Sequence, residues 1–187
     1  MYLAEYDELD ATGLAEMVRR KDVSPDELLR AAIDRAQARN TLLNAIVTPM
    51  YDEATSQIRS GLAQGPFRGV PFLLKDGTDY AGVPTRHGSR IFDKCPPPLQ
   101  HDDVTQKYLD AGLVIFGKTS MPELGNSGTT EAEAYGPCSN PWDTTRSPGG
   151  SSGGSASAVA GRIAPMASGG DGGARSATPR LLVVWWD

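Results

Sequence analysis

Residues 146–156 read RSPGGSSGGSA, a stretch in which pairs of glycines alternate with serines. The glycine-rich region continues to Gly173, with nine glycines in the 25 residues 149–173. Such a composition is typical of a flexible linker. However, residues 156–159 predict a helix and residues 163–167 predict a strand, so the glycines flank ordered elements. The stretch therefore predicts tight turns that bring backbone N–H groups close to a reacting carbonyl.

A phosphate-binding loop is a second interpretation of this stretch. That loop requires a lysine directly after its second conserved glycine, because the lysine reaches the phosphates. Here Gly154 is followed by Ser155, so the pattern does not fit.

Two short apolar runs precede the glycine-rich region, and a lysine lies within two residues after each run. Residues 70–74 (VPFLL) lead into Lys75, and residues 113–116 (LVIF) lead into Gly117 and Lys118. Apolar runs of this length, bounded by turn residues, are typical of buried strands. Residues 104–111 predict a helix before the second run. The alternation predicts an α/β fold with polar groups at strand ends, where such folds bind ligands.

The first sixty residues predict three helices and contain one short apolar run. Residues 10–20 carry apolar side chains at helical spacing, and Ser24 with Glu27 forms a capping box that starts a second helix. The apolar run 45–47 and a polar helix over residues 52–59 follow.

Composition excludes several classes of function. The 187 residues include 21 glycines and 14 prolines, carry a net charge of −5, and contain no continuous apolar stretch of the ~20 residues that a membrane helix needs. The acidic N-terminus does not resemble a secretory signal. Cys95 and Cys138 lie in no metal-ligand or disulfide pattern. We expect a cytoplasmic protein without a zinc site, a membrane partner or direct contact to nucleic acid.

If a serine of the glycine-rich stretch acts in catalysis, it needs a base, and the sequence offers four: His87, His101, Lys75 and Lys118. Both histidines lie in polar or proline-rich turns, where exposed histidines are common. Lys75 follows a buried strand, and burial lowers the pKa of a lysine until its neutral amine can accept a proton. Spacing alone does not decide among them.

Four segments together resemble the amidase signature family, hydrolases of carboxamide bonds that use a Ser-Ser-Lys relay. They are residues 146–156 (RSPGGSSGGSA), 69–76 (GVPFLLKD), 117–123 (GKTSMPE) and 135–143 (YGPCSNPWD), and they occur in the family's order. The resemblance extends from about residue 5 to Gly173. It implies the N-terminal part of a single α/β domain, in which helices cover a mixed central sheet.

The resemblance also implies roles for individual residues. Lys75 matches the family's buried base, and Ser151 matches the serine that bridges this base to a nucleophilic serine and adopts a cis peptide conformation. Ser152 and Asp171 are expected to support the loop, while Gly172 and Gly173 are expected to form the oxyanion turn. The substrate is expected to be a small-molecule amide, and the family mechanism needs no metal or cofactor.

The chain departs from the family after Gly173. The resemblance places the nucleophilic serine at position 175, which holds Arg175, and Ser176 lies one position late. Restoring one base before residue 174 allows the codons to read Gly-Ser-Ile-Arg, with serine at 175. Tryptophan has a single codon, so in the shifted frame the bases that encode residues 185–187 must read Val-Gly. We therefore interpret residues 1–173 as part of an amidase domain and residues 174–187 as an out-of-frame tail that ends the chain early.

Other interpretations stay open at this point. In one, residues 181–186 (LLVVWW) form a genuine final strand. In another, the chain is read as written and Ser176 substitutes as the nucleophile. A non-catalytic fragment that acts as a binding or assembly module is another alternative. The substrate is open between linear or cyclic amides and the misacylated transfer RNA served by an amidotransferase subunit. A homo-oligomer is an expectation for the full-length form.

Overall fold

A three-stranded mixed sheet lies at the centre of the structure, a computed structural model that describes residues 5–170. Strands β1 (Ile46–Pro49), β2 (Pro71–Lys75) and β3 (Val114–Thr119) are arranged in the order β1-β3-β2. Strand β3 pairs parallel with β2 and antiparallel with β1. The strands predicted over the apolar runs 70–74 and 113–116 are confirmed as β2 and β3, whereas β1 includes part of the run 45–47, for which no element was predicted. Strand β3 extends beyond the apolar run because Gly117, Lys118 and Thr119 pair with both neighbours.

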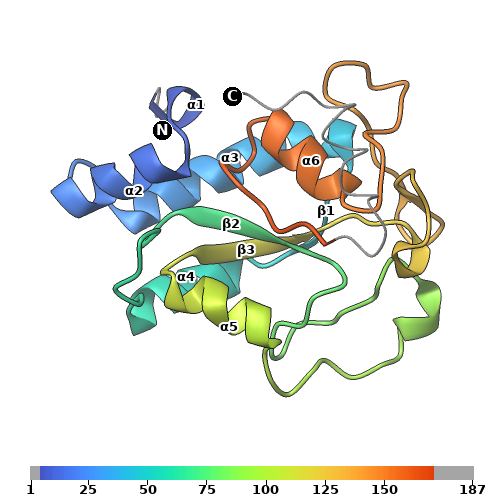
Figure 1. The fold of residues 1–187 in the computed structure, drawn as a ribbon, viewed down its shortest axis with the longest axis horizontal. Coiled ribbons are helices and arrows are strands. Elements are labelled where there is room, and N and C mark those ends of the chain that lie inside the picture. Colours follow the sequence, from blue (N-terminus) through green and yellow to red (C-terminus); the bar gives the residue numbers. More distant parts are fainter. Residues whose placement is uncertain (1–4, 171–187) are drawn as a thin grey trace.

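Helices cover both faces of this sheet (Figure 1). Helices α3 (Pro25–Leu43) and α6 (Gly153–Ala160) lie above it in that view, and α4 (Tyr51–Ser60) and α5 (Asp103–Asp110) lie below. Helix α2 (Ala11–Arg20) precedes α3 and buries Leu14 and Val18 in the core. The smaller elements are α1 (Glu5–Glu8), η1 (Arg90–Phe92), η2 (Glu123–Gly125), β4 (Glu131–Ala132) and β5 (Gly136–Pro137). The predicted α/β architecture is confirmed.

The helix starts follow from local side-chain chemistry. The Asp10 carboxylate accepts a hydrogen bond from the Gly13 N–H and caps α2. At α3, the Ser24 hydroxyl accepts from the Glu27 N–H, and the Glu27 carboxylate accepts from the Ser24 N–H. This reciprocal pair is the predicted capping box, which satisfies backbone donors that a helix start leaves open.

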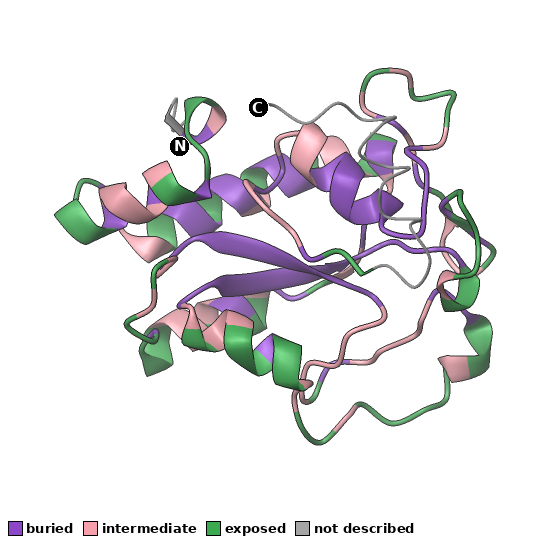
Figure 2. Ribbon diagram, viewed as in Figure 1, coloured by how far each residue is buried: buried purple, intermediate pink, exposed green. Residues whose placement is uncertain are grey.

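The apolar core is centred on β2 and β3, whose residues are all buried (Figure 2). Helix α3 contributes an apolar stripe, and α6 packs through small residues. The largest fully buried apolar side chains are Leu14, Leu28, Met50, Val70, Phe72, Leu73, Leu74, Leu113, Ile115, Phe116 and Ile163. Burial on both faces is the usual condition of a parallel strand pair covered by helices.

The strand predicted over residues 163–167 is wrong. The segment forms one isolated parallel bridge, between Ala167 and Leu73. Pro165 has no N–H to give to a ladder, and the preceding residues form the turn that ends α6. Only beyond the bridge does the segment bond to β2 again, where the Ser168 N–H donates to the Leu73 carbonyl. The predicted helix over 156–159 is confirmed within α6.

Three further findings concern residues 5–170. No helix among them is long and apolar enough to cross a bilayer. They contain no group of three histidine, cysteine or acidic side chains arranged to hold a metal ion. Both cysteines are free thiols; Cys95 is exposed and Cys138 is buried.

Candidate active site

The register of β2 and β3 sends their two terminal lysines to opposite faces of the sheet. Lys75 pairs with Thr119, and Leu74 pairs with Lys118. Because side chains alternate along a strand, Lys75 and Thr119 share one face and Lys118 points to the other. The hydroxyl of Thr119 contacts Ser155 of α6, so Lys75 projects from the face that α6 covers.

The loop before α6 brings Ser151 to the same face. Gly149 has a positive φ of 85°, and the peptide between Gly150 and Ser151 is cis, as the resemblance predicted. Helix α6 then packs so closely on the end of β3 that a Cβ on Gly154 would lie 2.4 Å from the Ser120 backbone nitrogen. Only glycine permits this approach, which sets the start of α6 directly beside the strand ends.

Lys75 and Ser151 meet in a buried contact. The Lys75 Nζ lies 2.8 Å from the Ser151 Oγ and 3.0 Å from the Gly170 carbonyl oxygen. Lys75 is 8% exposed and Ser151 is 2% exposed. The two residues are separated by 76 positions in the sequence, so only the tertiary fold creates the pair. Its chemistry is that of an amine held against a hydroxyl with which it can exchange a proton.

Ser152 fixes the segment that follows α6. Its Oγ accepts a hydrogen bond from the Gly170 N–H at 3.2 Å and lies 3.3 Å from the Gly170 carbonyl oxygen. Lys75 and Ser152 therefore both hold the backbone of Gly170, the last residue that the structure describes. The other predicted site positions, Asp171, Gly172, Gly173, Arg175 and Ser176, lie outside the described residues, as does the 181–186 segment.

A cavity of about 410 Å³ opens beside the Lys75 and Ser151 side chains. Its wall includes Tyr108, Met121 and His87. Of the two histidines considered as bases, His87 is half-buried and lines this cavity. His101 is also half-buried but borders a separate cavity between α4 and α5, where its Nδ1 accepts a hydrogen bond from the Ala81 N–H. Neither histidine is as exposed as the sequence suggested.

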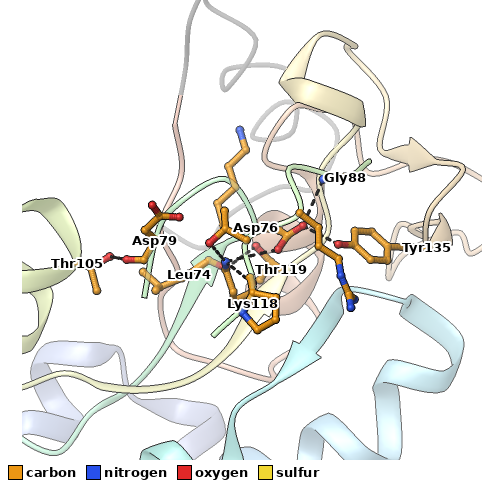
Figure 3. A network of polar contacts seen from close by, with 12 residues as sticks. Leu74, Asp76, Asp79, Gly88, Thr105, Lys118, Thr119 and Tyr135 are labelled. Atoms are coloured by element: carbon orange, nitrogen blue, oxygen red, sulfur yellow. Dashed lines mark hydrogen bonds and ion pairs between the residues drawn. The ribbon is translucent and has the colours of Figure 1, made fainter. Parts of the chain in front are cut away.

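Lys118, the other candidate base, belongs to a different network (Figure 3). Its Nζ donates to the Thr85 hydroxyl at 2.7 Å and to the Pro84 carbonyl at 3.0 Å, and it lies 3.6 Å from Asp76 Oδ1. Asp76 Oδ2 accepts from the Tyr135 hydroxyl at 2.8 Å. Lys118 and Asp76 are fully buried, so they form an internal ion pair.

Burial acts on the titrating groups of this network. Desolvation lowers the pKa of Lys118, and the nearby Asp76 carboxylate opposes that shift. Desolvation also raises the pKa of Tyr135, and the charge of Asp76 adds to that effect. Tyr135 therefore stays a neutral donor to Asp76. The geometry makes Lys118 a component of an ion pair, while Lys75 is the lysine that contacts a serine.

Sequence reasoning missed several residues around the pair. Thr119, Ser155 and Ser168 form buried hydrogen bonds behind Lys75, and Asp76 receives Lys118. Ser155 lies inside the glycine-serine stretch and Asp76 directly follows Lys75, so both were visible as neighbours of predicted site residues. Nothing in the local sequence distinguishes Ser168.

Comparison with known proteins decides the family. The family model described as Amidase matches residues 27–176 of this chain. The chain belongs to the amidase family. The family was predicted from the motifs around Lys75 and Ser151, and that prediction is confirmed.

Two curated amidase-family relatives show the range of similar proteins. A 6-aminohexanoate-cyclic-dimer hydrolase of Paenarthrobacter ureafaciens is 44% identical over 164 residues, which cover 87% of this chain and 33% of the relative. A glutamyl-tRNA(Gln) amidotransferase subunit of Acidothermus cellulolyticus is 43% identical over 179 residues, covering 92% of this chain and 35% of the relative. The chain thus spans about a third of the length of these relatives.

Solved structures of the amidase family share the fold. A structure of 6-aminohexanoate cyclic dimer hydrolase has a TM-score of 0.81 at 41% identity, over 85% of this chain and 33% of that chain. A bacterial aryl acylamidase of the amidase signature family has a TM-score of 0.85 at 32% identity, over 92% of this chain and 37% of that one. The described residues therefore form part of the α/β amidase fold.

Proposed function

We propose that this chain carries the base and the bridging serine of an amide hydrolase that cleaves carboxamide C–N bonds. The observation that carries the proposal is the buried 2.8 Å contact between Lys75 Nζ and Ser151 Oγ. An amine enclosed with a hydroxyl, beside a cavity of about 410 Å³, is the arrangement that a proton relay needs.

In this proposal Lys75 works as a neutral amine. Its lone pair accepts the proton of Ser151, while the Ser151 oxygen accepts the proton of a nucleophilic serine as that serine attacks the amide carbonyl. Collapse of the tetrahedral intermediate breaks the C–N bond, and the relay returns the proton to the leaving amine through Ser151. Water then hydrolyses the acyl-enzyme. Backbone N–H groups of Gly172 and Gly173 are assigned to the oxyanion, a contribution of several kcal/mol in such sites.

The nucleophile is the residue that the chain as written does not supply. Arg175 occupies its expected position, and we propose that one base is missing before residue 174, so that the intended reading contains a serine at 175. The chain as written is then inactive in hydrolysis. Ser176 is a poor substitute, because a shift of one residue moves the attacking oxygen by more than the ~1 Å that catalysis tolerates.

The substrate we propose is a small-molecule amide, linear or cyclic. The 44% identity to a cyclic-dimer hydrolase supports this class. The similarity to an amidotransferase subunit supports a second candidate, ammonia release for transfer-RNA-linked amidation, at nearly equal identity. A panel of both kinds of amide, tested on the frame-restored protein, separates the two candidates.

The decisive experiment uses a fluorophosphonate probe, which labels an activated serine. It is applied to the chain as written and to a version with one base restored before codon 174 that continues into the downstream reading frame. We expect labelling of the restored version alone. Labelling of the chain as written that disappears in Ser176→Ala would instead establish Ser176 as the nucleophile.

Two other outcomes would redirect the proposal. Resequencing the gene around codon 174 tests the frame directly, and an intact frame encoding Ala174, Arg175 and Ser176 contradicts it. If neither version labels and the chain is stable only with a partner, the protein is a non-catalytic binding or assembly module.

A further inference from the structure

Three buried residues, Thr119, Ser155 and Ser168, are linked by hydrogen bonds behind the Lys75 side chain, through the hydroxyls of Thr119 and Ser155 and through both the carbonyl and the hydroxyl of Ser168. Thr119 Oγ1 lies 2.7 Å from Ser155 Oγ, and Ser155 Oγ lies 2.7 Å from the Ser168 carbonyl oxygen. The Ser168 Oγ accepts the Lys75 backbone N–H, also at 2.7 Å. Thr119 and Ser155 are at most 3% exposed and Ser168 is 6% exposed, so bulk water cannot replace these bonds.

The number of hydroxyl protons determines which group donates and which accepts in each of these hydrogen bonds. Thr119 and Ser155 each have one hydroxyl proton, yet together they make three contacts, the third being from Thr119 to the Leu74 carbonyl at 3.2 Å. The two 2.7 Å contacts are the stronger ones and take the protons. Thr119 therefore donates to Ser155, and Ser155 donates to the Ser168 carbonyl.

These hydrogen bonds connect the three segments that surround the Lys75 amine. Thr119 lies at the end of β3 beside Lys75, Ser155 lies in the first turn of α6, and Ser168 lies in the returning segment. Two acceptors that the Lys75 Nζ contacts come from the same segments: Ser151 lies two residues before the start of α6, and Gly170 lies two residues after Ser168. The hydrogen bonds of Thr119, Ser155 and Ser168 thus hold the segments that carry Ser151 and Gly170.

We propose that Thr119, Ser155 and Ser168 are positioning residues that hold Ser151 and Gly170 at hydrogen-bonding distance from the Lys75 amine. The proposal rests on the proposed function only in treating Lys75 as the catalytic base. The effect of these residues on the titration of Lys75 can be measured without any hydrolysis. A deleted link lets α6 and the returning segment relax away from β2. The Lys75 ammonium then loses acceptors in a site that still excludes most water, and its protonated form becomes less favourable.

Ser157 provides a matched control. It lies two residues from Ser155 on the same helix, is fully buried, and its hydroxyl donates to the Ser139 carbonyl at 2.7 Å. Ser155→Ala and Ser157→Ala each remove one buried hydroxyl that donates to a backbone carbonyl at 2.7 Å, and Ser155→Ala also removes the 2.7 Å contact with Thr119. Only Ser155 is linked to the segments around Lys75, so a change in the Lys75 midpoint confined to Ser155→Ala separates a positioning role from a general loss of stability.

The experiment follows the side-chain resonances of 13C-labelled lysine in the full 187-residue chain through a pH titration. The chain has few lysines, and Lys→Arg variants assign each signal. We expect Ser155→Ala to lower the titration midpoint of Lys75 by about half a pH unit or more and Ser157→Ala to leave it within about 0.1 unit, where one unit corresponds to a tenfold change in proton affinity.

Variants of Thr119 provide an independent test if Ser155→Ala does not fold. Thr119→Val removes the hydroxyl at nearly constant shape and should lower the midpoint, whereas Thr119→Ser retains the hydroxyl and should restore it. A Lys75 midpoint that does not fall in Ser155→Ala or Thr119→Val, or that falls equally in Ser157→Ala, overturns the proposal. Absence of amide hydrolysis in every version would count against the proposed function and would leave this titration result unchanged.

Discussion

Lys75 is the last residue of β2 and Lys118 the last but one of the adjacent parallel strand β3, yet their environments differ. Lys75 contacts a serine hydroxyl and a backbone carbonyl on the face covered by α6. Lys118 points to the other face, where it binds Thr85 and Pro84 and lies 3.6 Å from the Asp76 carboxylate. In sequence the two lysines look alike, since each follows a short apolar run.

The difference shows how one strand pair places two lysines in different environments: one lies against a serine hydroxyl, and the other forms an internal ion pair. A lysine paired with a carboxylate gains by remaining charged, so it contributes an ion pair. Lys75 lies within hydrogen-bonding distance of a hydroxyl, a group with which an amine can exchange a proton. The single-residue offset in register, Leu74 opposite Lys118, is enough to separate the two roles.

The largest expected effect is the loss of activity on removing the Lys75 amine. In the frame-restored enzyme, Lys75→Met should slow fluorophosphonate labelling about 10²- to 10⁴-fold, because general-base contributions have this size. Lys107→Met, which alters an exposed lysine on α5, is the control and should label normally. Normal labelling of Lys75→Met would remove Lys75 from the relay.

Removing Lys118 should damage stability instead. Lys118→Met leaves the Asp76 carboxylate buried without its cation, and we expect a loss of about 3–5 kcal/mol in the free energy of unfolding. Urea denaturation measures it. The double variant Asp76→Asn with Lys118→Met should lose less than the sum of the two single variants, because it removes both charges. A loss below ~1 kcal/mol in Lys118→Met would mean that the ion pair is not structural.

A smaller effect is expected for the hydroxyl that supports Asp76. Tyr135→Phe deletes the 2.8 Å hydrogen bond to Asp76 and should cost about 1.5–3 kcal/mol, the usual range for a hydrogen bond to a charged group. Tyr51 is a half-buried tyrosine on α4, outside this network. Tyr51→Phe should therefore change the unfolding free energy by only a few tenths of a kcal/mol, and equal losses in both variants would contradict the assignment.

The smallest expected effect is the pH dependence that Lys118 adds to stability. Because burial lowers the pKa of Lys118 in the folded chain, the unfolded chain, with a lysine pKa near 10.4, binds this proton more tightly. The contribution is present above about pH 10.4 and is lost as the pH falls through the lowered folded value. The unfolding free energy of the wild type should rise with pH relative to Lys118→Met. A constant difference between the two, measured by urea denaturation from about pH 7.5 to 10, would contradict the shift.

The sequence predicted the elements of this fold better than their contacts. Capping chemistry at Ser24 and the apolar runs before Lys75 and Lys118 act locally, so they located helices and strands correctly. The predicted strand over 163–167 failed because Pro165 and the turn after α6 prevent regular pairing, and apolar composition does not reveal that.

The site was predictable only where a family motif carried it. Lys75 and Ser151 were paired through the resemblance, since 76 residues separate them and no local rule joins them. That Lys118 would bind Asp76 depends on register and on the turn that returns the chain near residue 85. Ser168 is an ordinary serine in sequence and gains its place only through the bridge at Ala167.

The separation of the site's parts in the sequence also sets the order in which it can form. The Lys75 amine bonds to Ser151 and to Gly170, which follow it by 76 and 95 residues. Contacts between distant segments form late, because the loop between them must close first. During synthesis β2 therefore emerges long before Ser151 and Gly170 do. Until residue 170 has left the ribosome, the contacts of the Lys75 amine with Ser151 and Gly170 cannot both form.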